Sequence, residues 1–329
     1  MLIRPTPLRW LARLAPLATL AVVVSFSAQA LAQSYPNRPL KFVVPFSAGS
    51  ATDAVGRIVA QAMAETLGQA VTVDNKAGAN GILGAEAVKS APGDGYTFLV
   101  TTSTTQAANV SLYKKLSYDP VKDFTPIGKI GETGFILMVQ ADFPAKDMKE
   151  FIAYGKAHPG KLAYGHGSSG SLVSAALLGQ MAGLDFLSVP YKSIPPALTD
   201  LLGGQLQFAF ADVGNAAAQI SGGRLRGLGV TTARRAGKAP QVPPIGDTVK
   251  DYAVGAWFGL MAPANLPADV RTKVSAAFAT VMAKPDVREK IQAAGIDVDY
   301  QDATQLAKII DSEIKKWSLW VKAANITPE

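Results

Sequence analysis

Short apolar runs alternate along the chain with segments in which apolar residues recur at helical spacing. Residues 41–45 predict a buried strand, and residues 53–67 predict a helix with an apolar position in every turn. Gly68 directly follows that helix, which is typical of a helix end. Strands at 71–73 and 96–101 and a helix at 82–90 continue the alternation. Strands that alternate with helices predict an α/β fold built on mainly parallel sheets.

A second set of elements of similar size follows. The remaining patterns predict strands at 135–139, 162–164, 187–189, 208–210, 225–231 and 257–261 and helices at 146–158, 172–181, 195–203, 267–282, 286–294 and 304–324. Two sets predict two lobes, the first made of residues 33–134 and 253–329 and the second of residues 135–252. Because the chain would cross between the lobes near 132–139 and 249–257, we expect a hinge and a cleft.

The first 32 residues have the three parts of a secretion signal. Three arginines open the segment without any acidic residue, and residues 14–26 form an apolar run. Small residues then lead to a predicted cleavage after Ala32. The apolar run is shorter than the ~20 residues that a membrane span requires. We therefore predict a signal peptide over residues 1–32 and a mature protein in the periplasm.

Composition narrows the chemistry. The chain has no cysteine, which excludes disulfides, thiolate metal ligands, a cysteine nucleophile and a lipid-modified cysteine. Loss of the three N-terminal arginines lowers the net charge from +7 to +4, and the basic residues are scattered. This pattern does not predict nucleic-acid binding and favours, at most, a small anion. We expect a monomer without a cofactor or a metal ion.

Three strand-to-helix loops are rich in small and hydroxyl residues. In the first, the helix that starts at Thr52 or Asp53 would offer unpaired N–H groups and a positive dipole, which suit a carboxylate. The alternative is that Asp53 only caps the helix. The predicted binding residues of this loop are Phe46, Ala48, Gly49, Ser50, Ala51, Thr52 and Asp53.

The second loop, 101–106, has hydroxyl residues that could line a polar site, and Ser103 and Thr104 are its candidates. The alternative is that its threonines satisfy their own backbone. The third loop, 165–171, precedes a helix. If the two lobes face each other, the first and third loops would form a clamp for an anion. Its predicted binding residues are Ser168, Ser169, Gly170 and Ser171.

Two further candidates follow strands. Asp212 follows the strand at 208–210, at the carboxyl edge where α/β sites gather, and could accept a hydrogen bond from the ligand or cap the next helix. Tyr191 follows the strand at 187–189 and could present its hydroxyl to the cleft or simply pack.

The third loop also allows two enzymatic alternatives. Gly165, Gly167 and Gly170 match the GxGxxG outline of a dinucleotide site, and Ser168 or Ser169 could serve a secreted serine hydrolase. However, the serines do not have GxSxG spacing, and the chain contains neither a Walker A nor an HExxH sequence. One of its two histidines, His166, lies in this loop and could contact a ligand. We therefore predict a binding protein and not an enzyme.

Several motifs, in order along the chain, are similar to those of the Bug family, whose members resemble the substrate-binding subunits of tripartite tricarboxylate transporters. The motifs are Tyr-Pro-Asn-Arg-Pro at 35–39, Val-Val-Pro-Phe-Ser-Ala-Gly at 43–49, Thr52 and Asp53 with Arg57, Gly-Ala-Asn-Gly at 78–81, Pro-Gly-Asp-Gly-Tyr at 92–96, Leu-Tyr-Lys-Lys-Leu-Ser-Tyr-Asp-Pro at 112–120, Val-Pro-Tyr-Lys at 189–192, Ala-Leu-Thr-Asp-Leu-Leu-Gly-Gly-Gln at 197–205 and Trp-Phe-Gly-Leu at 257–260.

The resemblance implies a two-lobed periplasmic binding protein of the Venus flytrap type. It implies a small, often carboxylated ligand held between the lobes, gripped by Phe46 and residues 48–53 on one side and residues 168–171 on the other. A closed form would dock on a membrane permease or act as a sensor input.

Four positions depart from the family pattern near the expected pocket. Ser50 and Ser193 stand where glycine is common, Ser174 stands where many members have histidine, and Ala211 precedes Asp212 where an Asp-Asn pair is frequent. Ligand identity therefore does not carry over. The smaller Ser174 suggests room for a larger ligand, so the expected class extends from di- and tricarboxylates to aromatic carboxylates.

Overall fold

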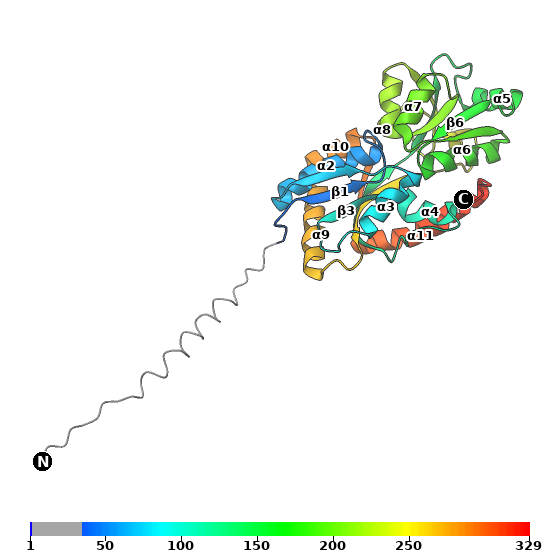
Figure 1. Ribbon diagram of the computed structural model, residues 1–329. Helices are drawn as coiled ribbons and strands as arrows, with labels where there is room; N and C mark the ends of the chain where they lie inside the picture. The colour runs from blue at the N-terminus through cyan, green and yellow to red at the C-terminus, as the bar shows by residue number, and fades with distance from the viewer. Residues whose placement is uncertain (2–34) are drawn as a thin grey trace. The chain divides into compact units, whose positions relative to one another are not determined.

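The computed structural model describes Met1 and residues 35–329, and the predicted signal peptide lies, apart from Met1, outside the described residues (Figure 1). Residues 38–329 form one contact unit that contains two sheets. We call the six-stranded sheet with its helices lobe 1 and the five-stranded sheet with its helices lobe 2.

The sheet of lobe 1 has the strand order β11-β4-β10-β3-β1-β2. β1 pairs with β2 and β3 in parallel, whereas β10 and β11 pair antiparallel with their neighbours. The strands are β1 Leu40–Val44, β2 Val71–Asn75, β3 Thr97–Thr102, β4 Phe124–Thr133, β10 Ala256–Pro263 and β11 Asp297–Asp302.

The sheet of lobe 2 has the order β7-β6-β8-β5-β9. β6 pairs with β7 and β8 in parallel, and β5 pairs antiparallel with β8 and β9. The strands are β5 Phe135–Gln140, β6 Leu162–His166, β7 Phe186–Pro190, β8 Phe208–Asp212 and β9 Leu225–Val230.

Both sheets are therefore mixed, and the expectation of mainly parallel sheets is wrong. A parallel neighbour requires a crossover, usually a helix. β5 follows β4 across Gly134 alone, and β10 also enters its sheet from the other lobe without a crossover helix. Both strands consequently run against their neighbours. The predicted α/β class and the two-lobed architecture are confirmed by the fold.

The predicted helices begin and end within two residues of the observed limits, except that α6 begins three residues earlier than predicted. Ser50 caps α2, and Gly68 ends it in the left-handed conformation, with φ of 69°. The helices are α2 Ala51–Leu67, α3 Ile82–Lys89, α4 Asn109–Leu112, α5 Met148–Ala157, α6 Ser169–Ala182, α7 Ile194–Leu202, α8 Val213–Ser221, α9 Ala268–Ala283, α10 Pro285–Ala293 and α11 Ala303–Ala323, with the short helical turns η2 Ala79–Gly81, η3 Thr104–Ala108 and η4 Ile245–Asp247.

Two differences concern predicted loops. Residues 104–108 form a π-helical turn, and residues 169–171 form the first turn of α6. Neither segment is the open loop that its composition suggested, because serine and threonine side chains there bind nearby backbone groups and stabilise a helical start.

Aromatic side chains build the core of lobe 2, where the Phe151 and Phe208 rings meet edge to face with centroids 5.3 Å apart. In lobe 1, Leu306 and Ile310 of α11 pack against Val43 and Leu99 of the sheet. α11 continues past this core, where its buried Trp317 contacts residues of η3, α4 and α6. The C-terminal helix therefore contributes to both lobes.

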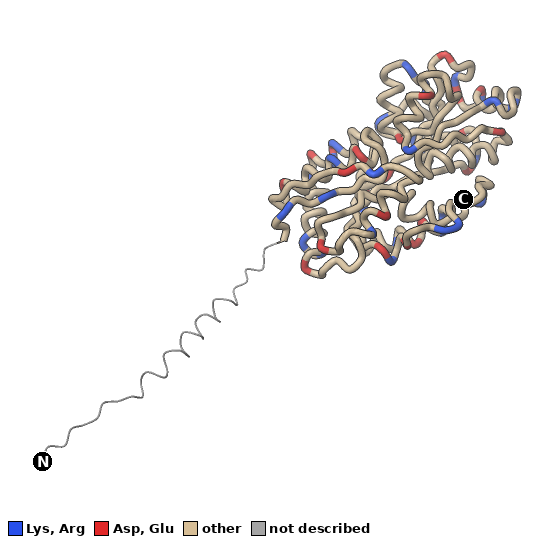
Figure 2. Tube along the Cα trace, in the orientation of Figure 1, with Lys and Arg blue, Asp and Glu red and all other residues tan. Residues whose placement is uncertain are grey.

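Lysines and arginines are interspersed with aspartates and glutamates along the described chain (Figure 2). Among the described residues, no helix is both long and apolar enough to cross a membrane. Within the same residues, no group of three or more histidine, aspartate or glutamate side chains is placed to bind a metal ion.

Candidate ligand-binding site

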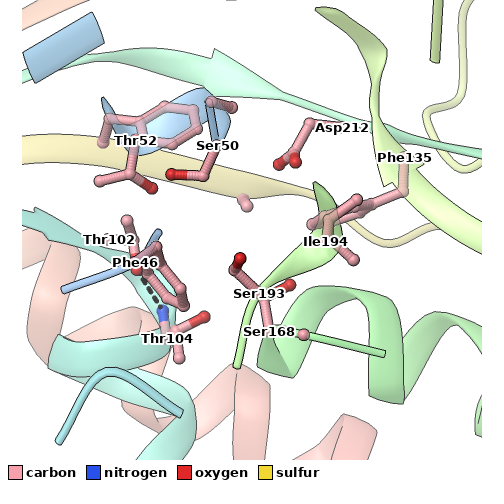
Figure 3. A pocket seen from close by; sticks show the side chains of 14 residues that line it. Phe46, Ser50, Thr52, Thr102, Thr104, Phe135, Ser168, Ser193, Ile194 and Asp212 are labelled. Atoms are coloured by element: carbon pink, nitrogen blue, oxygen red, sulfur yellow. Dashed lines mark hydrogen bonds between the residues drawn. The ribbon is translucent and has the colours of Figure 1, made fainter. Parts of the chain in front are cut away.

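A pocket lies where loops of both lobes meet (Figure 3). Its empty volume is about 390 Å³, which includes space open to solvent at its mouth. The lining residues are Phe46, Ser50, Ala51, Thr52, Thr102, Thr104, Phe135, Gly167, Ser168, Ser193, Ile194, Asp212, Ala256 and Phe258.

The lobe 1 wall includes the N-terminus of α2. Gly49 makes the turn before the helix with φ of +81°, a value that favours glycine. Ser50 is the N-cap, and its Oγ accepts a hydrogen bond of 3.2 Å from the Asp53 N–H. Ala51 and Thr52 follow in the first turn, where backbone N–H groups have no partner within the helix. These N–H groups are therefore free to donate to a ligand.

Three helices of lobe 2 begin at the same pocket. Ser168 caps α6 through its hydroxyl, whereas Ser193 and Asp212 occupy the N-cap positions of α7 and α8 without a side-chain capping bond. With α2, four helix N-termini converge on one space. Each carries a partial positive charge, so the pocket attracts an anion although no lysine or arginine of the described chain lines it.

Aromatic side chains supply the apolar part of the pocket. Phe46, Phe135 and Phe258 line it from three different strands or loops, together with Ile194 and Ala256. Of these, only Phe46 was predicted. Phe135 and Phe258 belong to β5 and β10, which carry the chain between the lobes, and their sequence pattern indicates only buried strands.

The predicted residues divide into two groups. Seven line this pocket, and eight do not. Those that line it are Phe46, Ser50, Ala51, Thr52, Thr104, Ser168 and Asp212, and those that do not are Ala48, Gly49, Asp53, Ser103, Ser169, Gly170, Ser171 and Tyr191. Sequence reasoning did not select seven lining residues, which are Thr102, Phe135, Gly167, Ser193, Ile194, Ala256 and Phe258. Three of them had a signal: Thr102 and Gly167 lie in the second and third predicted loops, and Ser193 departs from the family pattern.

Asp53 braces the first loop and does not line the pocket. Its carboxylate accepts hydrogen bonds from Gly49 N (3.0 Å), Asn75 Nδ2 (2.9 Å) and Arg57 Nε (3.1 Å). Burial by itself would raise the pKa of Asp53, but the bonds from Arg57, Gly49 and Asn75 together lower it below its ordinary value. The ionised carboxylate thus holds the loop that carries Phe46 and Ser50.

Replacing Asp53 by asparagine is expected to lower the free energy of unfolding at pH 7 by about 1–3 kcal/mol, because charge-assisted bonds are lost. Because the pKa of Asp53 is lower in the folded protein than in the unfolded chain, its ionised carboxylate stabilises the fold fully above the ordinary pKa of aspartate. This contribution is lost as the pH falls below that value towards the pKa of the folded state. The difference from wild type should therefore shrink between pH 5 and pH 3 in denaturant unfolding. Asp74→Asn, at a half-exposed ion pair of 3.7 Å with Lys76, is the control, and an equal loss there would contradict the bracing role.

The hydroxyl groups of residues 101–105 mostly bind one another and the backbone. Thr101 Oγ1 lies 2.9 Å from Thr105 Oγ1, and Thr105 Oγ1 donates to the Thr102 carbonyl at 3.2 Å. Thr102 Oγ1 accepts from Thr104 N at 3.2 Å. Ser103 is buried without a partner for its hydroxyl. Of this segment, only Thr102 and Thr104 line the pocket.

The predicted residues of lobe 2 that do not line the pocket bind or pack against other protein groups. Ser171 forms a capping box with Ser168, and Gly170 lies so close to the Phe135 ring that a Cβ would overlap it. Ser169 Oγ accepts from Asn80 Nδ2 of lobe 1 at 2.7 Å. Tyr191 donates to Asp200 Oδ2 at 2.6 Å. Of the family departures, Ser174 is fully buried and does not line the pocket.

The serines have no imidazole partner among the described residues. Ser168 Oγ contacts Ser171 Oγ at 3.2 Å, and Ser169 is bound by Asn80. His166 lines a neighbouring cavity with Tyr191, and burial lowers its pKa to about 4. This arrangement does not activate a serine, since an activated serine requires a base within hydrogen-bond reach.

A cleft between two α/β lobes, entered by helix N-termini and lined by hydroxyl and aromatic groups, defines the class of two-lobed solute-binding proteins. Residues 55–326 match the model of the family described as "Tripartite tricarboxylate transporter family receptor", and the chain belongs to this family. Its relatives and structural neighbours are solute-binding proteins, and the chain is accordingly a solute-binding protein and not an enzyme.

The similarity extends over most of the chain. A UPF0065 protein from the tcbD-tcbE intergenic region of Pseudomonas sp. strain P51 is 33% identical over 92% of this chain and 91% of its own length. Three solved structures are also similar. They are Rpa4515 of R. palustris with adipate (30% identity, TM-score 0.87, 90% of this chain and 100% of that one), the periplasmic binding protein BugD (31%, 0.85, 90% and 100%) and MatC of Rhodopseudomonas palustris with bound malate (33%, 0.82, 87% and 100%). The predicted resemblance to the Bug family is thereby confirmed.

Proposed function

We propose that the protein captures a small carboxylate in the interlobe pocket, in the periplasm, and presents it to the permease of a tripartite tricarboxylate-type transporter or to a sensor. The observation that carries this proposal is the convergence of four helix N-termini on one pocket without a lysine or arginine among the described lining residues. Such a site binds an anion through N–H groups and hydroxyls.

The similar proteins support a carboxylate. Rpa4515 and MatC, at 30% and 33% identity, hold adipate and malate. The three phenylalanines of the present pocket favour a ligand with an apolar body, either an aliphatic chain or an aromatic ring.

Ligand binding would stabilise the closed arrangement of the lobes. Asn80 Nδ2 of lobe 1 donates to Ser169 Oγ of lobe 2 at 2.7 Å and to Asn109 Oδ1 at 3.0 Å, so the lobes are in direct contact beside the pocket. We propose that residues 33–134 and 253–329 move as one body against residues 135–252, with hinges at Gly134 and near residues 252–256.

The test is a binding screen on protein secreted from the full chain and purified from the periplasmic fraction. Mono-, di-, tri- and aromatic carboxylates are compared by thermal shift, with matched alcohols and amides as controls. A ligand at a hundred times its Kd should stabilise the fold by about 2.7 kcal/mol. Stabilisation by carboxylates alone supports the proposal, and stabilisation only by uncharged solutes contradicts it. Mass determination of the N-terminus tests cleavage after Ala32.

A further inference from the structure

Asp212 is the one titratable side chain among the described residues that line the pocket. It occupies the N-cap position of α8 but makes no capping bond, and its carboxyl group faces the pocket (Figure 3). The capping role considered from the sequence is therefore not what this side chain does. It remains available to a ligand.

No lysine or arginine of the described chain lines the pocket beside Asp212. Burial raises the pKa of Asp212 to about 6, and hydrogen bonds with its own backbone and with Asn215 offset the effect only in part. At pH 7.5 the group is mainly ionised and accepts hydrogen bonds without donating any. A second carboxylate of a ligand placed beside it would be repelled.

Ser193 adds an unsatisfied polar group to the same pocket. Its hydroxyl is fully buried and has no hydrogen-bond partner, although buried polar groups are ordinarily paired. Gly167 packs so closely against the backbone of Ser193 that a Cβ on Gly167 would overlap it. An unpaired hydroxyl in a binding pocket is suited to a polar substituent of the ligand.

The pocket therefore offers two kinds of recognition. The N-termini of α2 and α6, at Ser50–Thr52 and Ser168, suit a carboxylate, whereas Asp212 accepts and Ser193 both donates and accepts. A ligand that satisfies all of these groups has a carboxylate at one position and an O–H or N–H donor at another, joined by the apolar body that the phenylalanines contact.

We propose that Asp212, with Ser193, makes the protein selective for carboxylates that carry a hydroxyl or amino substituent over the same carboxylates without it. This inference rests on the proposed function and narrows its ligand class. A site built to bind a donor discriminates strongly against the analogue that lacks it, because the buried acceptor is then left unpaired.

The experiment compares matched pairs by calorimetry at pH 7.5: succinate with malate, benzoate with each hydroxybenzoate, and a straight-chain acid with its amino acid. For at least one pair, the donor-bearing member should bind at least tenfold more tightly to the wild-type protein. Asp212→Ala should remove that preference, and Ser193→Ala should reduce it. Asp212→Asn, which keeps the shape and an acceptor oxygen, should retain part of it. Thermal unfolding without ligand checks that each variant is folded.

The outcomes separate the inference from the proposed function. If carboxylates bind but every pair binds equally, or Asp212→Ala keeps the preference, the inference is wrong and the proposed function stands. If affinity for the donor-free member rises as pH falls from 8 to 5, Asp212 acts as a protonated donor to a carboxylate, which also overturns the inference. If no carboxylate binds the wild type, the proposed function fails first and the inference with it. If Asp212→Ala does not fold, Ser193→Ala and the wild-type pairs decide.

Discussion

Replacing Gly214 by alanine is expected to weaken carboxylate binding at least tenfold while both lobes stay folded. Gly214 is the second residue of α8 in lobe 2, and it contacts the turn at Ala294 and Gly295 that precedes β11 in lobe 1. A Cβ on Gly214 would lie 2.9 Å from the Ala294 carbonyl carbon and closer still to its oxygen. Both groups are backbone, so neither can rotate away.

The clash lies beside the direct connection between the lobes, because Val213 N donates to the Gly134 carbonyl at 3.2 Å and Thr133 Oγ1 donates to the Gly295 carbonyl at 2.9 Å. Relief of the clash requires α8 and this turn to move apart, which would misplace Asp212 at the N-terminus of α8 in the pocket. A ligand that binds the wild-type arrangement of the pocket must then also overcome the repulsion. A tenfold loss corresponds to about 1.4 kcal/mol, a modest cost for overlapping backbone atoms. Calorimetry should therefore report the weaker affinity, and X-ray scattering should show a smaller ligand-induced contraction than in the wild type.

Gly222→Ala is the matched control for this prediction. Gly222 is the C-cap of the same helix with φ of −73°, and a Cβ there would be 3.5 Å from its nearest neighbour, the Ala218 carbonyl oxygen. It should bind ligand like the wild type. If Gly214→Ala also binds and contracts like the wild type, the contact between α8 and the Ala294–Gly295 turn is not a feature of the ligand-bound state.

Replacing Trp317 by alanine is expected to cost about 3–5 kcal/mol of unfolding free energy, the range for truncating a buried aromatic side chain. Trp317 is fully buried in a cluster with Ala107, Leu112 and Val173, and its Nε1 donates to Glu313 Oε2 at 3.2 Å. Since Val173 belongs to lobe 2 and Ala107 to lobe 1, the cavity would loosen the junction between the lobes as well as α11.

Trp320 provides the comparison on the same helix. It is half-buried, and its ring meets the Trp317 ring edge to face with centroids 5.1 Å apart. Trp320→Ala should cost clearly less, because part of its surface is already in water. Guanidinium unfolding of the two variants measures the difference. Equal losses would mean that the cluster around Trp317 collapses around the cavity.

Two strands, β4 and β11, were not predicted, because their local pattern of apolar and polar residues is not typical of a strand. β11, Asp297–Asp302, has three aspartates and lies at the sheet edge, so polar residues are tolerated there. β4, Phe124–Thr133, includes Pro126, Gly128 and Gly131, which interrupt the usual strand signal. Gly128 and Gly131 are required by their neighbours, since a Cβ would overlap the backbone or rings packed beside them.

The site residues also divide into those that local sequence predicts and those that only long-range contacts bring together. The sequence determined by itself what is local: the alternation of strands and helices, the small residues before α2, the start of α2 to within two residues, and the motifs that identify the family. These follow from side-chain spacing and capping chemistry within a few residues. Only the tertiary structure decided three things: Phe135, Ser193 and Phe258 also line the pocket, Asp53 braces the first loop without lining the pocket, and the direct crossings between lobes make both sheets mixed. Those outcomes depend on contacts between residues far apart in the chain, which the local spacing of residues does not encode.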